Sequence, residues 1–140
     1  MKRRRLLLNG EKERFIVFAY GDTGTRIGGW TMPSNPQNWR TFKDGYIQMG
    51  TGVGYSYGGI SFNFTDYSEL HIVASTGSKG ALVGYGSYAN PYSAGWKGET
   101  IDIPADEAKA EYVLDVSEQT GTQYICFYAG FLCVYDIWLV

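Results

Sequence analysis

The sequence predicts an all-β protein built as a two-sheet antiparallel β-sandwich. Three observations favour this fold. The 140 residues suit a single domain, the 19 glycines and 12 tyrosines accompany only four prolines, and apolar residues alternate with polar ones along several short segments. Short alternating segments between glycine-rich turns are typical of sheets that each turn one face toward a shared core. A chain of this length can bury that core without disulfide or metal staples.

The C-terminal stretch 122–140, TQYICFYAGFLCVYDIWLV, is the expected centre of the fold. Its aromatic and β-branched residues suit strands, and a helix through them would have no polar face. We expect two strands that form a hairpin around Ala129-Gly130. A two-residue turn would place Cys126 opposite Cys133, a register that would allow a disulfide.

A three-residue turn would instead place Phe127 opposite Cys133 and send the two cysteines to opposite faces. We prefer this second register because it gathers a cleaner apolar set on one face, and we expect both cysteines to be reduced. That apolar set is Ile125, Phe127, Tyr135, Ile137 and Leu139.

The remaining strands bring the expected total to about nine or ten, with the first and last strands close together. Asp44-Gly45 is a strong signal for a two-residue hairpin turn. The alternation is clearest in 60–64 and 69–74, which we expect to pair, while 50–59 and 85–99 are predicted to be loops rich in glycine and tyrosine. The other strands are predicted at 15–20, 39–43, 46–50, 81–85, 101–103 and 112–116.

The first fourteen residues differ in charge from the rest of the chain. They carry six basic and two acidic side chains, whereas the remainder is acidic overall. A secretory signal needs an apolar run of about 7–15 residues, and three leucines do not supply it. No stretch reaches the roughly 20 apolar residues of a membrane helix. We therefore divide the chain into a basic N-terminal arm, 1–14, and a β-sandwich domain, 15–140.

Three interpretations of this arm are open: a docking segment, a solvated terminus, and a nucleic-acid contact through phosphate. We favour docking because like-charged terminal runs are often interaction tails, and because the acidic body would repel a duplex. The arginines would bind an acidic partner surface while the leucines enter a groove of a neighbour. The predicted docking residues are Arg3, Arg4, Arg5, Leu6, Leu7 and Leu8.

No motif for catalysis, a metal or a cofactor stands out. The aspartates Asp22, Asp44, Asp66 and Asp102 are expected at turns, where the residue hydrogen-bonds the local backbone. His71 is the single histidine, and we expect it exposed on the outer side of a strand. No glycine loop leads into a helix, as phosphate binding would require. The sequence therefore predicts a protein that is not an enzyme and holds no cofactor or metal.

Aromatic residues in the two predicted loops are the strongest candidates for binding. They alternate with Gly, Ser and Asn, a mixture that combines rigid contact area with adaptable hydrogen bonding. Sugar rings stack on such side chains. The alternative is that the rings only cover the ends of the sandwich. The candidate ligand-binding residues are Tyr55, Tyr57, Tyr88, Tyr92 and Trp96.

Short motifs resemble the late strands of jelly-roll domains of the carbohydrate-binding-module kind: Asp66-Tyr67-Ser68 before an LHI strand, Asp115-Val116-Ser117, and the closing Tyr135-Asp136-Ile137-Trp138-Leu139. The opening MKRRRLLLNG, followed by a Gly-Gly-Trp element, is similar to small virion proteins of phages and prophages of Gram-positive bacteria. An acidic calcium cluster, which many such modules use, is not recognisable.

This resemblance implies a jelly-roll-like, non-enzymatic structural or adhesion protein of the virion, in its tail, baseplate or capsid. It would dock through its arm onto other virion proteins and form a homo-oligomer, with neither nucleic acid nor membrane as partner. The alternative function is a carbohydrate-binding module that recognises cell-surface glycan through the tyrosine- and tryptophan-rich loops.

Overall fold

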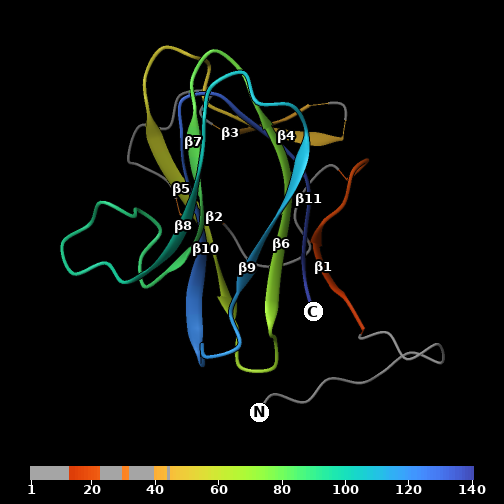
Figure 1. Ribbon diagram of the computed structural model, residues 1–140, viewed down its shortest axis with the longest axis vertical. Coiled ribbons are helices and arrows are strands. Elements are labelled where there is room, and N and C mark those ends of the chain that lie inside the picture. The colour runs from red at the N-terminus through yellow and green to blue at the C-terminus, as the bar shows by residue number, and fades with distance from the viewer. Residues whose placement is uncertain (1–12, 23–29, 32–39, 44) are drawn as a thin grey trace.

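The computed structural model describes residues 13–22, 30–31, 40–43 and 45–140. In this part of the chain, strands form two antiparallel sheets that pack face to face (Figure 1). The predicted β-sandwich is therefore confirmed. Within the described residues, no helix is long and apolar enough to cross a membrane. The docking residues predicted between Arg3 and Leu8 lie outside the described part of the chain.

Sheet 1 has the order β3-β4-β11-β6-β9, and β1 pairs with β11 beyond the end of β4. Phe15 of β1 lies opposite Leu139 of β11, so the first and last strands are adjacent as expected. The strands are β1 (Phe15–Phe18), β3 (Arg40–Lys43), β4 (Tyr46–Met49), β6 (Glu69–Thr76), β9 (Ala110–Asp115) and β11 (Leu132–Leu139).

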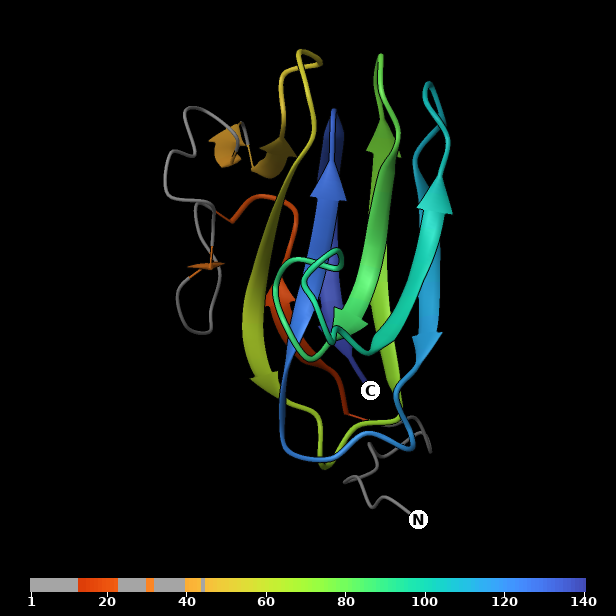
Figure 2. The same ribbon diagram turned by 90° about the vertical axis from the view of Figure 1, so that its left-hand side faces the viewer.

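Sheet 2 has the order β2-β5-β10-β7-β8. Its outer side faces the viewer in Figure 2, with the connection between β7 and β8 in front of the strands. The strands are β2 (Trp30–Thr31), β5 (Ser56–Asn63), β7 (Ala81–Gly86), β8 (Gly98–Ile103) and β10 (Thr122–Ala129).

The hairpin predicted for the C-terminal stretch is wrong, although both of its strands exist. β10 pairs with β5 and β7 in sheet 2, while β11 pairs with β4, β1 and β6 in sheet 1. Each strand therefore has both edges occupied, and the chain crosses between the sheets at Gly130-Phe131. Cys126 and Cys133 are free thiols on different sheets, so neither predicted register applies.

The pairing predicted between 60–64 and 69–74 fails for the same reason. β5 belongs to sheet 2 and β6 to sheet 1, so the two strands lie in opposite layers of the sandwich. The alternation predicts Ile60, Phe62 and Phe64 on the inner face of one strand and Leu70, Ile72 and Ala74 on the inner face of the other. All of these except Phe62 are fully buried, and Phe62 is partly buried and packed against the core. Alternation identifies the buried face of a strand, and it does so equally for a neighbour in the sheet and for a partner across the core.

Tyr135 was expected to face the core and does not. The register of β11 against β6 shifts between Val134 and Asp136, which reverses the alternation at that point. Val134 and Ile137 are both fully buried, whereas Tyr135 packs its ring against Tyr20 on the outer side. A bulge of this kind cannot be seen in a strict period of two.

The predicted turn between β3 and β4 is confirmed. Lys43 lies opposite Tyr46, which leaves two residues for the turn, and Gly45 has a φ of +88°. This left-handed conformation is readily available to glycine. Asp44 itself lies outside the described residues.

The two predicted loops are shorter than expected. Ser56 to Gly59 form the first half of β5, Gly86 is the last residue of β7, and Gly98 begins β8. The connecting segments that remain are 50–55 and 87–97. Glycine in these positions belongs to a strand, where it marks a close approach of other chain atoms.

We predict that the valine pair Val134 and Val113 will respond very differently to truncation. Val134→Ala on the central strand β11, at 0% exposure, should lower the free energy of unfolding by about 2 kcal/mol. Val113→Ala on the edge strand β9, at 45% exposure, should lower it by about 0.5 kcal/mol or less. Urea unfolding of both variants measures the difference. Equal losses would contradict the assignment of β11 to the centre of sheet 1.

Candidate functional site

One row of side chains crosses the outer face of sheet 2. The strand register places Tyr57, Tyr128, Leu82 and Asp102 side by side on β5, β10, β7 and β8. Because neighbouring side chains alternate between faces, Tyr128 points outward next to the inward, fully buried Phe127. The row therefore presents two tyrosines, an aliphatic chain and a carboxylate on a rigid sheet.

A cavity of about 580 Å³ lies over three residues of this row, Tyr128, Leu82 and Asp102. Its aromatic wall is a cluster of three tyrosines centred on Tyr128. The Tyr55 ring is nearly parallel to that of Tyr128, at 7° with 5.8 Å between centroids, and the Tyr92 ring meets Tyr128 edge-on at 4.7 Å. Both geometries are favourable for aromatic pairs, so each ring holds the others in place.

Charged residues line the cavity as well. They are Lys79 and Asp102, and Pro104 and Ala105 of the turn after β8 lie beside them in the lining. The Lys79 ammonium lies 5.5 Å from the centroid of the Tyr55 ring, which is within the range of a cation-π contact. Asp102 was expected at a turn, but it is a residue of β8. The cavity thus joins flat apolar rings to one cation and one anion.

The segment 87–97, here called the tyrosine loop, contributes Tyr92 to the cavity and is held by its own hydrogen bonds. The Tyr92 N–H donates to Asn90 Oδ1 at 2.9 Å, and the Trp96 N–H donates to the Ser93 carbonyl at 3.1 Å. At its base, the Ser87 N–H donates to the Lys97 carbonyl at 2.9 Å. These bonds give the loop a defined shape that projects Tyr92 toward Tyr128.

The tyrosine loop lies in front of the strands of sheet 2 in Figure 2, and part of it packs against their outer face. A Cβ at Gly59 of β5 would lie 3.1 Å from the Ala89 side chain, and one at Gly86 of β7 would collide with the Trp96 ring. Cys126 of β10 also points outward, yet it is fully buried. The loop therefore covers the middle of this face, where glycine leaves room for it.

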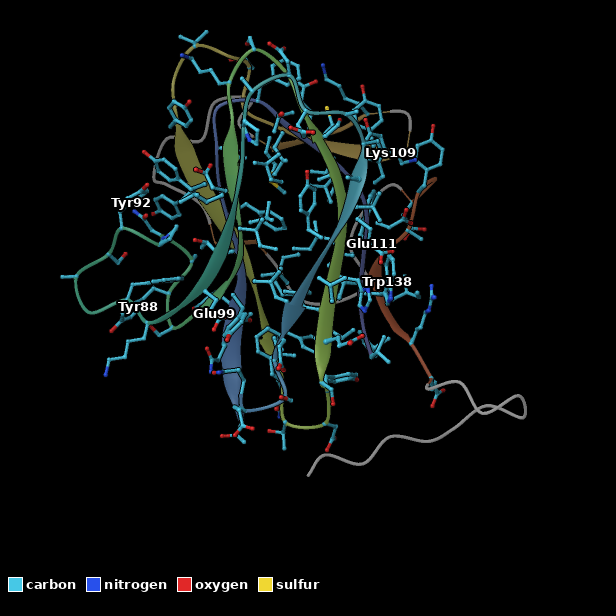
Figure 3. The ribbon with its side chains drawn as sticks, in the orientation of Figure 1. Tyr88, Tyr92, Glu99, Lys109, Glu111 and Trp138 are labelled. Atoms are coloured by element: carbon cyan, nitrogen blue, oxygen red, sulfur yellow. The ribbon has the colours of Figure 1, made fainter. Side chains whose placement is uncertain are left out.

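The five predicted ligand-binding residues have different environments. Tyr55 and Tyr92 line the cavity, with 51% and 67% of their surface exposed. Tyr57 lies beside Tyr128 in the outward row. Tyr88 projects from the tyrosine loop on the same side as Tyr92, away from Trp138 of sheet 1 (Figure 3).

Trp96, the fifth of these residues, packs between the tyrosine loop and the sheet. Its ring lies against Gly86 and Gly98, and its Nε1 donates to the Tyr88 carbonyl at 3.0 Å. It fastens the tyrosine loop to the sheet. Sequence reasoning missed Tyr128, Leu82 and Lys79, although alternation around the buried Ile125 and Phe127 could have marked Tyr128 as outward.

The outer face of sheet 1 carries a second aromatic group, but other side chains of the protein already cover its ring surface. His71 stacks on Trp138 at 4.8 Å, its Nε2 lies 2.9 Å from Glu69, and its Nδ1 lies 3.4 Å from Glu111. The Arg14 guanidinium also lies over the Trp138 ring, at 4.8 Å. His71 points outward as expected, but its side chain is only 13% exposed because these partners cover it.

Among the described residues, no three His, Cys, Asp or Glu side chains gather closely enough to hold a metal ion. Burial raises the pKa of the Cys126 thiol to about 12. Burial also raises the pKa of the Cys133 thiol, although bonding to Ser75 and the charge of Lys43 oppose the increase. Both cysteines are therefore protonated and weakly nucleophilic near neutral pH.

Comparison with solved structures shows the same sandwich in a group of carbohydrate-binding modules. The chain is similar to CBM29_1, a family 29 carbohydrate-binding module from Piromyces equi, with a TM-score of 0.60 and 13% identity over 91% of this chain and 89% of that one. Two variants of the module CBM29-2 are also similar. One is complexed with mannohexaose, at TM-score 0.58 and 15% identity over 91% and 90% of the chains.

The other CBM29-2 variant is complexed with cellulohexaose, at TM-score 0.56 and 14% identity over 91% and 89% of the chains. No family model matches the sequence, and no curated protein matches it. At these identities the likeness establishes the fold: an all-β sandwich like that of the family 29 modules.

We predict that Cys126 will report on the seating of the tyrosine loop. In a Cys133→Ser background, a maleimide at pH 7.5 should label Cys126 slowly, since the thiol is buried and protonated. Adding Trp96→Ala removes the ring that holds the loop against Gly86, so labelling should accelerate at least tenfold. Mass spectrometry of the labelled protein measures the rate.

Tyr92→Ala, at the exposed part of the same loop, is the control and should leave the labelling rate unchanged. Fast labelling of the Cys133→Ser protein itself would contradict the proposed cover over Cys126.

Proposed function

We propose that this protein is a non-catalytic carbohydrate-binding module and that it binds glycan in the tyrosine-lined cavity on sheet 2. The observation that carries this proposal is the cluster of Tyr55, Tyr92 and Tyr128 in a cavity of about 580 Å³ that Lys79 and Asp102 also line. Sugar rings have apolar faces bordered by hydroxyl groups. Such a ligand stacks on tyrosine while its hydroxyls hydrogen-bond the charged side chains at the edge.

The shape of the site indicates how much of a glycan it accepts. Tyr128, Leu82 and Asp102 line the cavity from three adjacent strands, and the two interstrand spacings between them amount to about 10 Å. More than one sugar ring fits along this row. The tyrosine loop covers the sheet below it, so a bound glycan would run across the strands and not along them.

The solved structures give this proposal its second support. CBM29-2 variants with the same fold are complexed with mannohexaose and cellulohexaose. These ligands belong to the other proteins, and the low identity transfers none of their binding residues. Mannohexaose and cellulohexaose are nevertheless the first ligands to test.

A structural role on a virion remains a separate prediction. It depends on docking by residues between Arg3 and Leu8, which lie outside the described residues. The similar solved structures are carbohydrate-binding modules, and they favour glycan binding over a role in a virus particle. Virion location, virion partners and a homo-oligomer likewise stay predictions.

We predict that Tyr92→Ala will weaken glycan binding while the fold stays intact. Loss of one stacking ring should lower the affinity for mannohexaose or cellulohexaose at least tenfold, which corresponds to about 1.4 kcal/mol. Isothermal titration calorimetry measures the affinity. Tyr92 is 67% exposed, so the melting temperature should change by no more than about 1 °C.

Tyr20→Ala is the matched control, because Tyr20 is another exposed tyrosine, at 61%, and packs on sheet 1 beside Tyr135. Its affinity should equal that of the unaltered protein. Equal affinity of all three proteins would rule out the cavity as the glycan site.

The non-catalytic assignment is tested by chromatography of the hexasaccharide after overnight incubation with the protein. The appearance of shorter products would overturn this assignment.

A further inference from the structure

A second cavity of about 540 Å³ opens at the other end of sheet 2. It lies where β7 ends, β8 begins and β10 begins, at the base of the tyrosine loop. No residue lines both cavities. Whereas the first cavity has three tyrosines, the second is walled mainly by amide, hydroxyl and charged groups. Its polar lining residues include Tyr85, Ser87, Lys97, Glu99, Gln119 and Gln123.

Three of these side chains form one hydrogen-bonded chain. Gln123 Nε2 donates to Gln119 Oε1 at 2.6 Å, and Gln119 Nε2 donates to the Tyr85 hydroxyl at 3.3 Å. Each amide nitrogen carries two hydrogens and uses one of them in this chain. The Tyr85 oxygen accepts, so its own proton is available to a further acceptor. The chain thereby fixes several donors at the wall of one cavity.

Tyr85 anchors this chain rigidly. Its side chain is only 3% exposed, and its ring meets Phe64 of the core edge-on at 5.9 Å and 89°. Burial raises the pKa of the Tyr85 hydroxyl, and the nearby Glu99 and Asp115 charges raise it further against the Gln119 hydrogen bond. The hydroxyl therefore keeps its proton and acts as a donor throughout the neutral range.

The charges at the cavity favour a neutral ligand. Glu99 supplies a carboxylate and Lys97 an ammonium group, so an anion or a cation would be attracted by one and repelled by the other. Amides, hydroxyls and a charge of each sign suit a ligand that has several groups able both to donate and to accept. A compound with several hydroxyl groups has this property.

We propose that this amide-lined cavity is a second binding site, for a neutral polyhydroxylated ligand of about one sugar residue. Its volume is within the roughly 300–1,000 Å³ of small-ligand pockets. The hydroxyls of the ligand accept hydrogen bonds from the amide groups of Gln119 and Gln123 and donate hydrogen bonds to the Glu99 carboxylate. The site does not depend on glycan binding at the first cavity, because the two share no residue.

Side-chain amide resonances provide the direct test. The ¹⁵N-labelled protein is titrated with glucose, mannose, N-acetylglucosamine and glycerol, and the amide groups of Gln119 and Gln123 are followed. We expect at least one of these probes to shift both resonances with saturation. Tyr85→Phe keeps the ring against Phe64 and should lower the affinity for that probe at least fivefold. Gln123→Leu should abolish the shift of the Gln119 amide resonance.

Tyr92→Ala is the matched control for the first cavity, and it should leave the shifts of both glutamines unchanged. If none of the four probes moves the two amides, or if Tyr92→Ala abolishes their shifts, the second site is overturned. A failure of hexasaccharide binding at Tyr92 and Tyr128 would leave this result intact, so the two proposals are tested separately.

Discussion

The fold depends on the burial of two inward faces: that of β10 against sheet 1 and that of β11 against sheet 2. These consecutive strands lie near the centre of opposite layers, and their buried residues Ile125, Phe127, Val134 and Ile137 join one core cluster. Each large apolar side chain removed from water contributes about 1.5–3 kcal/mol. A hairpin would have placed all of them in one sheet and left the other without a central strand. The crossing at Gly130-Phe131 therefore determines both layers, and the remaining strands pair outward from them.

The same strand that supplies the core also supplies the candidate site. Along β10, Phe127 points into the sandwich and Tyr128 points out of it, so the central ring of the tyrosine cluster stands on one of the most constrained strands of the molecule. Tyr55 and Tyr92 come from connecting segments and complete the cluster around this fixed ring. A site of this kind combines a rigid floor with walls that vary in sequence at little cost to folding.

The sequence predicted the strands and their buried faces well, because both follow from the period of two. Ile60, Leu70 and Ile72 are buried as the alternation indicates. Strand pairing could not be predicted in the same way, since a strand looks alike whether its successor lies beside it or across the core. Tyr135 was misplaced because a bulge reverses the alternation after Val134. The sequence analysis selected Trp96 as a ligand-binding aromatic. Its contact with Gly86 arises because the tyrosine loop packs on sheet 2, which the local sequence does not encode.

The tyrosine loop packs against glycines on the outer face of sheet 2 and contributes residues to both cavities. Since Gly59 and Gly86 present no side chains, the tyrosine loop lies directly on the strands and covers Cys126. The outer part of the loop then contributes Tyr92 to the aromatic cavity, while its base contributes Ser87 and Lys97 to the amide-lined one. A larger residue at Gly86 would displace Trp96 and shift both ends of the loop together. Packing of the tyrosine loop against these glycines therefore influences the geometry of both cavities.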